Sequence, residues 1–164
     1  MTSNNTNLVG VCGLYCGACG IYRATQDNAE EKLEEFARGL SAKTGKEFTV
    51  DDVRCDGCLV NGRLDLWCRN CQIRVCEKLQ SGNIRCSDCD EFPCTRLTDF
   101  RDDGMNHHSE ITDNLEQLQK MGIKAWTEYE ENRWTCAECK TTLSWYDSVC
   151  PGCGASRSKL LFNL

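Results

Sequence analysis

Apolar residues recur at intervals of three or four positions in three stretches of this chain. Residues 28–44 place alanine, leucine and phenylalanine on one side of a helical turn, with glutamate and lysine on the other. Residues 109–121 repeat the pattern with isoleucine, leucine and methionine, and residues 124–132 repeat it with alanine, tryptophan and tyrosine. The pattern predicts three helices whose apolar faces form the core.

Residues near the ends of these stretches indicate where the helices begin and end. Asn28 can cap the first helix, and Glu31 stands three positions later, as in a capping box. Gly45 and Gly122 follow the last periodic residues of the first two stretches, where a helix commonly ends at glycine. The acidic pair 130–131 is expected on a solvated helix face.

A second pattern lies between the helices and consists of cysteines. Residues 68–76 and 86–94 share the spacing C-x2-C-x4-C and are offset by eighteen positions. Two copies are too few for a solenoid, so we expect two similar cysteine knuckles. Each knuckle is followed by a short predicted helix, at about residues 77–80 and 95–101.

The C-terminal stretch has a pattern of its own. Two C-x2-C pairs stand ten residues apart, and residues 141–146 between them (TTLSWY) have the composition of a strand. Gly154 follows the second pair and can adopt the backbone angle that such a turn requires. We therefore expect a small α+β protein stapled by metal, with an α-rich cysteine-knuckle domain over residues 8–131 and a β zinc ribbon over residues 132–164.

Cysteine dominates the composition. The chain holds 15 cysteines in 164 residues, and twelve of them form six C-x2-C pairs. Two residues between a pair of thiols let both sulfurs face one metal ion. Every cysteine is therefore a candidate metal ligand, namely Cys12, Cys16, Cys19, Cys55, Cys58, Cys68, Cys71, Cys76, Cys86, Cys89, Cys94, Cys136, Cys139, Cys150 and Cys153.

Metal binding fits this composition better than a disulfide framework. Residues 51–94 hold eight cysteines and few large apolar side chains, and a structural zinc site supplies about 10 kcal/mol or more toward folding. The cysteine count is odd, and residues 1–10 lack the basic and apolar regions of a signal peptide. Because cytoplasmic thiols stay reduced, we expect a cytoplasmic protein that does not enter a membrane.

Counting ligands leaves a remainder. One tetrahedral zinc ion would take the four C-terminal cysteines, and two further four-thiolate sites would use eight of the remaining eleven. One histidine added to the last three thiols would complete another site, and His107 and His108 are the only histidines. We keep both as candidate ligands, beside the alternative that they form a solvated loop pair.

The sequence leaves the grouping of the eleven N-terminal thiols open. One arrangement combines two pairs at a time, Cys16/Cys19 with Cys55/Cys58 and Cys68/Cys71 with Cys86/Cys89. Another arrangement uses sequential sets, Cys55, Cys58, Cys68 and Cys71, followed by Cys76, Cys86, Cys89 and Cys94. The first arrangement leaves three thiols unassigned, Cys12, Cys76 and Cys94.

The metal bound by the N-terminal thiols also stays open. Four thiolates close the coordination sphere of zinc, so the C-terminal site is expected to be structural. Several zinc ions are the main expectation for the whole chain, and a [4Fe–4S] cluster is the alternative for the N-terminal domain, although the compact ferredoxin run is absent. The spacing C-x3-C-x2-C at residues 12–19 is typical of radical-SAM enzymes, but the chain offers no large barrel to hold such a site.

No complete catalytic site is visible in the sequence, which lacks phosphate-loop, dinucleotide-binding, zinc-protease and nucleophile-elbow motifs. We expect a non-enzymatic zinc module that contacts a protein partner. One alternative is an iron–sulfur redox or cluster-carrying protein. Another is nucleic-acid contact, which the net charge of −6 disfavours, through aromatic and basic side chains of the ribbon: Trp134, Trp145, Tyr146, Arg133, Arg157 and Lys159.

The order of the motifs resembles one known family. Residues 12–19 (CGLYCGAC), 55–58 (CDGC), 68–76 (CRNCQIRVC) and 86–94 (CSDCDEFPC) are similar in order and in intervening residues to the cysteine-rich family DUF3795. The resemblance covers about residues 8–130, and the C-terminal part looks like the zinc ribbon that some members carry. It implies metal binding in the cytoplasm of an anaerobe, and no particular activity.

Overall fold

Short helices joined by long loops make up the chain in a computed structural model. The structure describes residues 5–82 and 84–157. None of the helices described there is long and apolar enough to cross a lipid bilayer. The helices are α1 (Gly20–Gln26), α2 (Glu30–Thr44), α3 (Val50–Val53), α4 (Leu66–Arg69), α5 (Glu77–Gln80), α6 (Thr95–Arg101), α7 (Ile111–Met121) and α8 (Ile123–Arg133), with the 3-10 turns η1 (Asn5–Leu8), η2 (Cys16–Ala18), η3 (Cys86–Asp88) and η4 (Asn106–His108).

The helices predicted from periodicity lie close to their expected positions as α2, α7 and α8, and the two short ones as α5 and α6. Gly45 and Gly122 follow α2 and α7 with φ angles of 72° and 79°, as expected of glycines that end helices. The predicted capping box is wrong, because Ala29 is the N-cap residue of α2 and makes no side-chain cap. Asn28 has φ of 50° and turns the chain between α1 and α2, a conformation that asparagine tolerates better than most residues.

The predicted strand and β ribbon are wrong, and with them the α+β class. Residues 5–82 and 84–157 contain no strand, and β-pairing there is limited to isolated bridges such as Thr135 with Thr142. The backbone of residues 141–146 bonds in several directions instead of along one partner. Leu143 N–H donates to the Trp134 carbonyl, and Trp145 N–H donates to the carbonyl of Ala18 in η2. The described chain is therefore helix-rich, and its C-terminal segment is held by loop contacts.

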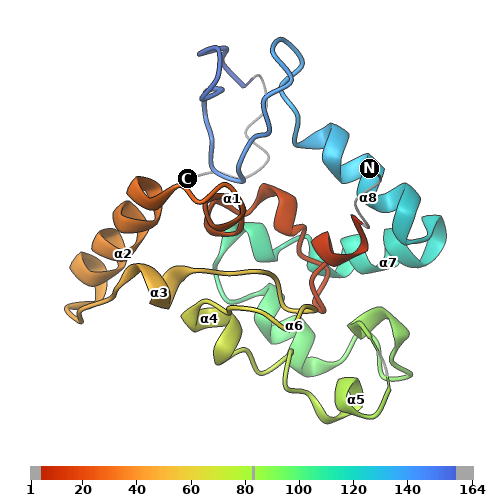
Figure 1. The fold of residues 1–164 in the computed structure, drawn as a ribbon. Coiled ribbons are helices and arrows are strands. Elements are labelled where there is room, and N and C mark those ends of the chain that lie inside the picture. Colours follow the sequence, from red (N-terminus) through yellow and green to blue (C-terminus); the bar gives the residue numbers. More distant parts are fainter. Residues whose placement is uncertain (1–4, 83, 158–164) are drawn as a thin grey trace.

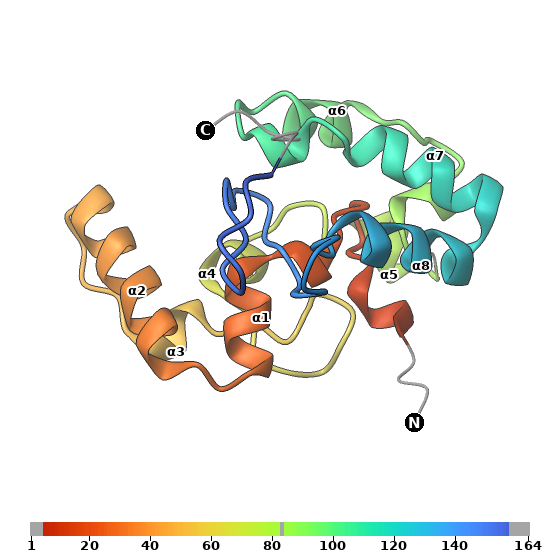
Figure 2. The same cartoon turned by 90° about the horizontal axis from the view of Figure 1, so that it is seen from above.

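Three groups of buried side chains form the core. One joins α1, α2 and α3 through residues such as Ala24, Leu33 and Val53. A second lies around α6, α7 and the N-terminal cysteine segment, and contains Leu97 and Leu115. In Figures 1 and 2, α2 and α3 lie on one side of α1, while α7 and α8 lie on the other.

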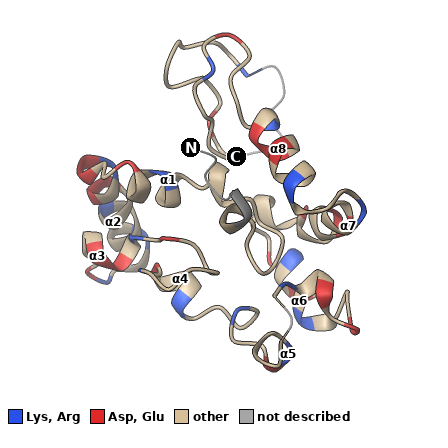
Figure 3. Cartoon of the chain, turned by 45° about the vertical axis from the view of Figure 1, so that its right-hand side comes forward, with Lys and Arg blue, Asp and Glu red and all other residues tan. Residues whose placement is uncertain are grey.

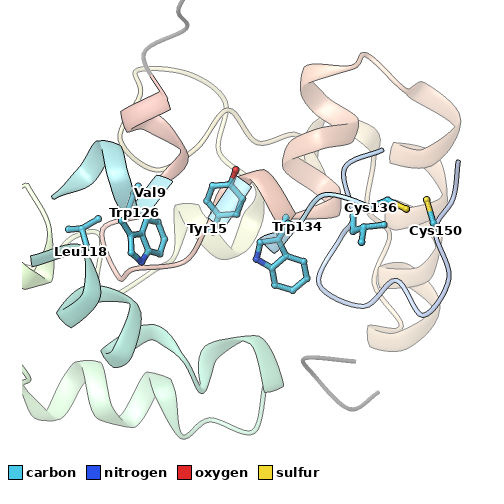
Figure 4. Close-up of a cluster of buried hydrophobic side chains, with 9 residues drawn as sticks. Val9, Tyr15, Leu118, Trp126, Trp134, Cys136 and Cys150 are labelled. Atoms are coloured by element: carbon cyan, nitrogen blue, oxygen red, sulfur yellow. The ribbon is translucent and has the colours of Figure 1, made fainter. Parts of the chain in front are cut away.

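The third group connects the helical body with the C-terminal segment. Figure 4 shows its side chains in a row that runs from α7 and α8 to two cysteines. Trp126 and Trp134 are 0% and 1% exposed, and Trp126 meets Tyr15 edge to face at a ring-centroid distance of 6.1 Å. Cys136 and Cys150 belong to the same group. These two C-terminal cysteines are therefore packed against the body of the protein.

A buried carboxylate supports this row. Glu130 is 1% exposed, which corrects the expectation of a solvated side chain there, whereas Glu131 is exposed as expected. Its carboxylate accepts hydrogen bonds from Trp134 Nε1 at 2.9 Å and from Arg133 Nη1 at 3.2 Å, and Arg133 also donates to Glu110 at 2.7 Å. Burial raises the pKa of Glu130, and the neighbouring Arg133 only partly opposes this shift. The carboxylate therefore depends on its two donors.

We predict that Arg133→Met destabilises the protein by about 2 kcal/mol, because it removes a charged donor from a buried carboxylate. The measurement is denaturant unfolding of the metal-loaded protein, followed by circular dichroism. Lys120→Met is the control, since the pair of Lys120 with Glu116 on α7 is exposed and its loss is expected to cost about 0.5 kcal/mol or less. Equal losses in the two variants would contradict the structural role of Arg133.

Candidate metal centres

The four C-terminal cysteines meet in one group. The Sγ atoms of Cys136, Cys139, Cys150 and Cys153 all lie within 4.8 Å of one another. Cys136 and Cys153 are 3.8 Å apart, and Cys139 and Cys150 are 3.5 Å apart. A zinc–sulfur bond of about 2.3 Å places the sulfurs of a tetrahedral site about 3.8 Å apart. The group therefore has the dimensions of a site for a single metal ion.

Two similar turns position these four thiols. In each turn the N–H of the residue after the second cysteine donates to the carbonyl of the first, from Lys140 to Cys136 at 3.0 Å and from Gly154 to Cys150 at 2.9 Å. Lys140 and Gly154 have φ angles of 63° and 73°, so both turns pass through the left-handed region. The predicted role of Gly154 is confirmed, and lysine accepts the same conformation in the first turn.

The first turn also favours the thiolate form of a cysteine. The Thr141 hydroxyl lies 3.2 Å from Cys139 Sγ. This contact, together with backbone and thiol hydrogen bonds, lowers the pKa of Cys139 to about 6. Because metals bind the thiolate and not the thiol, Cys139 is ready to coordinate at neutral pH.

The eleven N-terminal thiols form a band of neighbouring groups instead of one compact site. Cys55 and Cys68 have their Sγ atoms 4.0 Å apart. Burial raises the pKa of Cys19 to about 11, and the charges of Cys55 and Asp65 contribute to the shift. One end of the band therefore lies where η2 and the start of α4 meet.

Asp65 is a site residue that the cysteine pattern did not reveal. A carboxylate oxygen of Asp65 lies within 4.8 Å of the sulfurs of Cys55 and Cys68. Its Oδ1 accepts hydrogen bonds from the backbone N–H groups of Trp67 at 2.8 Å and Cys68 at 2.9 Å, and its side chain is buried. The available signal was an aspartate three residues before Cys68, which is the spacing of a helix N-cap.

The middle of the band separates the members of two C-x2-C pairs. Cys58 Sγ accepts a hydrogen bond from the Val11 N–H at 3.3 Å. Burial raises the pKa of Cys12 well above the usual range, and the charges of Cys58, Cys71 and Cys86 add to that effect. Cys55 therefore faces Cys68, whereas its pair member Cys58 lies toward Cys12 and Cys71.

Cys16 lies between these neighbours. Burial raises its pKa, and the largest charge contributions come from Cys58, Cys19 and Cys55. Each group along this part of the band thus combines thiols from distant segments. The structure does not gather Cys16, Cys19, Cys55 and Cys58 into a group within tetrahedral distance in the described residues.

The far end of the band surrounds a small cavity. Its wall contains four cysteines that follow one another in sequence, Cys76, Cys86, Cys89 and Cys94. Burial raises the pKa of Cys86 to about 12, with further contributions from Cys94, Cys76 and Cys89. These four thiols are the second set of the sequential arrangement.

The two histidines are packed beside the C-terminal segment. His107 Nδ1 lies 2.6 Å from the Tyr146 hydroxyl, and the His107 ring stacks on Trp145 at a centroid distance of 4.3 Å. His108 Nδ1 lies 2.9 Å from a carboxylate oxygen of Asp103, and the side chain is buried. They are not a solvated loop pair. Neither histidine belongs to the closely spaced ligand groups of the described residues, so a role as ligand stays a prediction.

We predict that acid weakens the contact made by His107. Burial lowers the pKa of His107 from about 6.5 to about 4, so the unfolded chain binds a proton between these values that the folded chain does not. Stability therefore falls as pH falls from 6.5 toward 4, by about 2 kcal/mol at pH 5. His107→Phe, which keeps a ring on Trp145, should flatten this slope in denaturant unfolding, with bound zinc measured at each pH. A slope equal to that of the parent would contradict the prediction.

We also predict that Asp65 strengthens metal retention by the Cys55–Cys68 group. Asp65→Ala removes the α4 cap and a negative charge beside two thiols, and loss of such a supporting group typically weakens metal binding about tenfold or more. Asp65→Asn keeps a cap acceptor and should weaken binding less. Chelator competition on the full chain measures both, and equal retention in parent and Asp65→Ala protein would contradict the prediction.

The comparisons with known proteins agree with the cysteine pattern of the N-terminal part. A family model described as a protein of unknown function, DUF3795, matches residues 8–99. Searches of the curated proteins and of the solved structures found no match. The matched region contains all eleven N-terminal cysteines, and the C-terminal cysteine group lies outside it. Because the match spans more than half of the chain, this protein belongs to the DUF3795 family.

Proposed function

We propose that the protein is a non-enzymatic metal-binding module whose C-terminal cysteine group holds one zinc ion. The observation that carries this proposal is the approach of four Sγ atoms to within 4.8 Å of one another, with the pairs Cys136–Cys153 and Cys139–Cys150 at 3.8 and 3.5 Å. Zinc is the ion most often bound by four thiolates at these distances. Four thiolates leave no position for water, so the zinc is structural.

The zinc ion would secure the C-terminal segment on the helical body. Cys136 and Cys150 share a buried group with Trp134 and Tyr15, and the segment holds the body through the bonds of Leu143 and Trp145. A segment without strands gains little from backbone pairing, so a metal cross-link between its two turns supplies the constraint. The ion therefore links the two turns that flank this buried group.

Metal binding also accounts for the buried N-terminal thiols. Burial raises the pKa of Cys12, Cys16 and Cys19, so each stays a neutral thiol unless a cation compensates the thiolate. All fifteen cysteines are free of disulfides. Bound metal would provide the positive charge, and folding of this domain would be coupled to metal binding.

We propose a protein partner for the exposed apolar side chains of the cysteine-rich segment. Trp67, Val75 and Ile84 are 53%, 46% and 59% exposed. Acidic and basic residues are mixed on α2, α6 and α8 (Figure 3). Side chains of this kind suit contact with another protein better than contact with phosphates.

The nucleic-acid alternative receives less support. Trp134, which stacking on bases would require at the surface, is 1% exposed. Arg133 is held by Glu110 and Glu130, and the guanidinium carbon of Arg157 lies 4.4 Å from the centroid of the Trp134 ring. Lys159 lies outside the described residues. The aromatic and basic side chains named for this role that the structure describes are therefore engaged within the protein.

We predict that Cys139→Ser removes about one zinc ion per chain, because oxygen replaces one of four thiolates of a closed site. Cys139 is exposed, so the change leaves no cavity. Elemental analysis after dialysis measures zinc, and tryptophan fluorescence reports on Trp134 and Trp145 in the same segment. Ser148→Ala, an exposed change between the two turns, is the control. Unchanged zinc in Cys139→Ser protein would contradict the proposal.

A further inference from the structure

The cavity between α5, η3 and α6 differs in kind from the C-terminal cysteine group. Its wall is built from Cys76, Cys86, Cys89 and Cys94 together with three apolar side chains, Leu79, Phe92 and Leu97, and Lys78. In the described residues no three of these four sulfurs lie within 4.8 Å of one another, whereas all four C-terminal sulfurs do. The four cysteines thus line a cavity here, and their sulfurs are not gathered as closely as those of the C-terminal group.

The dimensions of this space exceed those of a site for a single ion. A tetrahedral zinc ion draws its sulfurs to about 3.8 Å from one another, which leaves no cavity among them. The volume open to the centre of a water molecule is about 30 Å³ in this cavity, whereas one buried water needs about 10–15 Å³. A larger inorganic group that still binds four separate thiolates matches this space better.

The backbone holds the four cysteines around the cavity. Cys76 precedes α5 and accepts hydrogen bonds from Leu79 and Gln80, while Cys94 precedes α6 and accepts from Leu97. Cys86 and Cys89 lie at the two ends of η3, where the Cys89 N–H donates to the Cys86 carbonyl at 3.1 Å. The four cysteines therefore come from three short elements, two of them from η3, and all four line the same space.

We propose that this cavity holds a cubane [4Fe–4S] cluster, with Cys76, Cys86, Cys89 and Cys94 as its four ligands. In such a cluster each thiolate binds a different iron atom, so the sulfurs stand farther apart than around one ion. Each thiol loses its proton on binding. The chain would then bind an iron–sulfur cluster here and zinc at the C-terminal group. Only the zinc part rests on the proposed function.

The surroundings of the proposed cluster are apolar. Four thiolates and a core of charge +2 give a net charge of −2. Leu79, Phe92 and Leu97 line the space, and only apolar atoms of its wall are exposed to it. Lys78 is paired with Glu91 at 3.0 Å and Asp90 at 3.4 Å. The cluster therefore lies against an apolar wall, and the ammonium of Lys78 is held by Asp90 and Glu91.

The test is anaerobic reconstitution of the full chain with ferrous iron, sulfide and zinc, followed by analysis of all three per chain and by visible absorption. We expect the parent protein to be brown, and Cys86→Ser to lose about four iron and four sulfide per chain relative to it. Cys139→Ser should keep the iron and lose zinc. The two variants exchange a thiol for a hydroxyl in the same way, so each is the control of the other.

A second variant keeps all fifteen thiols and reduces only the volume of the cavity. Leu79→Phe places a larger side chain in the cavity wall and should lower bound iron and sulfide at least severalfold, while a site for a single zinc ion would be unaffected. Ile84→Phe is the matched control, because Ile84 is 59% exposed and does not line the cavity. Circular dichroism confirms that each variant is folded.

Three results would contradict the proposal of a cluster. These are parent protein that binds zinc but no iron, Cys86→Ser protein with the iron content of the parent, and folded Leu79→Phe protein with unchanged metal. The zinc assignment fails separately, by equal zinc in the parent and in Cys139→Ser protein. The two conclusions are therefore distinguishable in one set of samples.

Discussion

Burial of cysteine is the constraint on which the rest of this structure depends. Cys12, Cys55, Cys136 and Cys150 occupy core positions that are 4–6% exposed. They sit among helices as short as the four-residue α3, α4 and α5, which have little stability of their own in water. A buried thiol is only a small apolar side chain, but a buried thiolate needs a compensating cation. The packing of this chain and its capacity to bind metal are therefore linked.

The C-terminal and N-terminal parts of the protein arrange their thiols in different ways. At the C-terminus two turns of the same form bring four sulfurs together, and the row of Trp126, Tyr15 and Trp134 seats them on the helical body (Figure 4). At the N-terminal part the thiols spread as a band from η2 to α6. The first arrangement suits one ion, and the second suits several metals or a polynuclear group. Both proposals follow from this contrast in spacing.

Local patterns were sufficient to predict α2, α5, α6, α7, α8 and the C-terminal cysteine group, but not α1, α3 and α4. Apolar residues at helical intervals depend only on residues within one turn, so α2, α7 and α8 could be placed. The four C-terminal cysteines lie within 18 residues of chain, and two turns suffice to join them. The strand predicted at residues 141–146 failed, because composition does not say where a backbone finds its hydrogen bonds. Those bonds go to Trp134 and Ala18, and Ala18 is more than a hundred residues away.

The sequence by itself determined which residue types are candidate metal ligands, but not which of them lie close to one another. Three features depend on how distant segments pack. Cys55 lies beside Cys68, whereas Cys58 lies toward Cys71. The Asp65 carboxylate lies beside two thiols, and Glu130 is buried. The spacing of residues along the chain predicts contacts only within a turn or two. The four ligands of one site can come from segments that are far apart in the sequence. For that reason only the tertiary structure decided the grouping of the thiols and the size of the space between them.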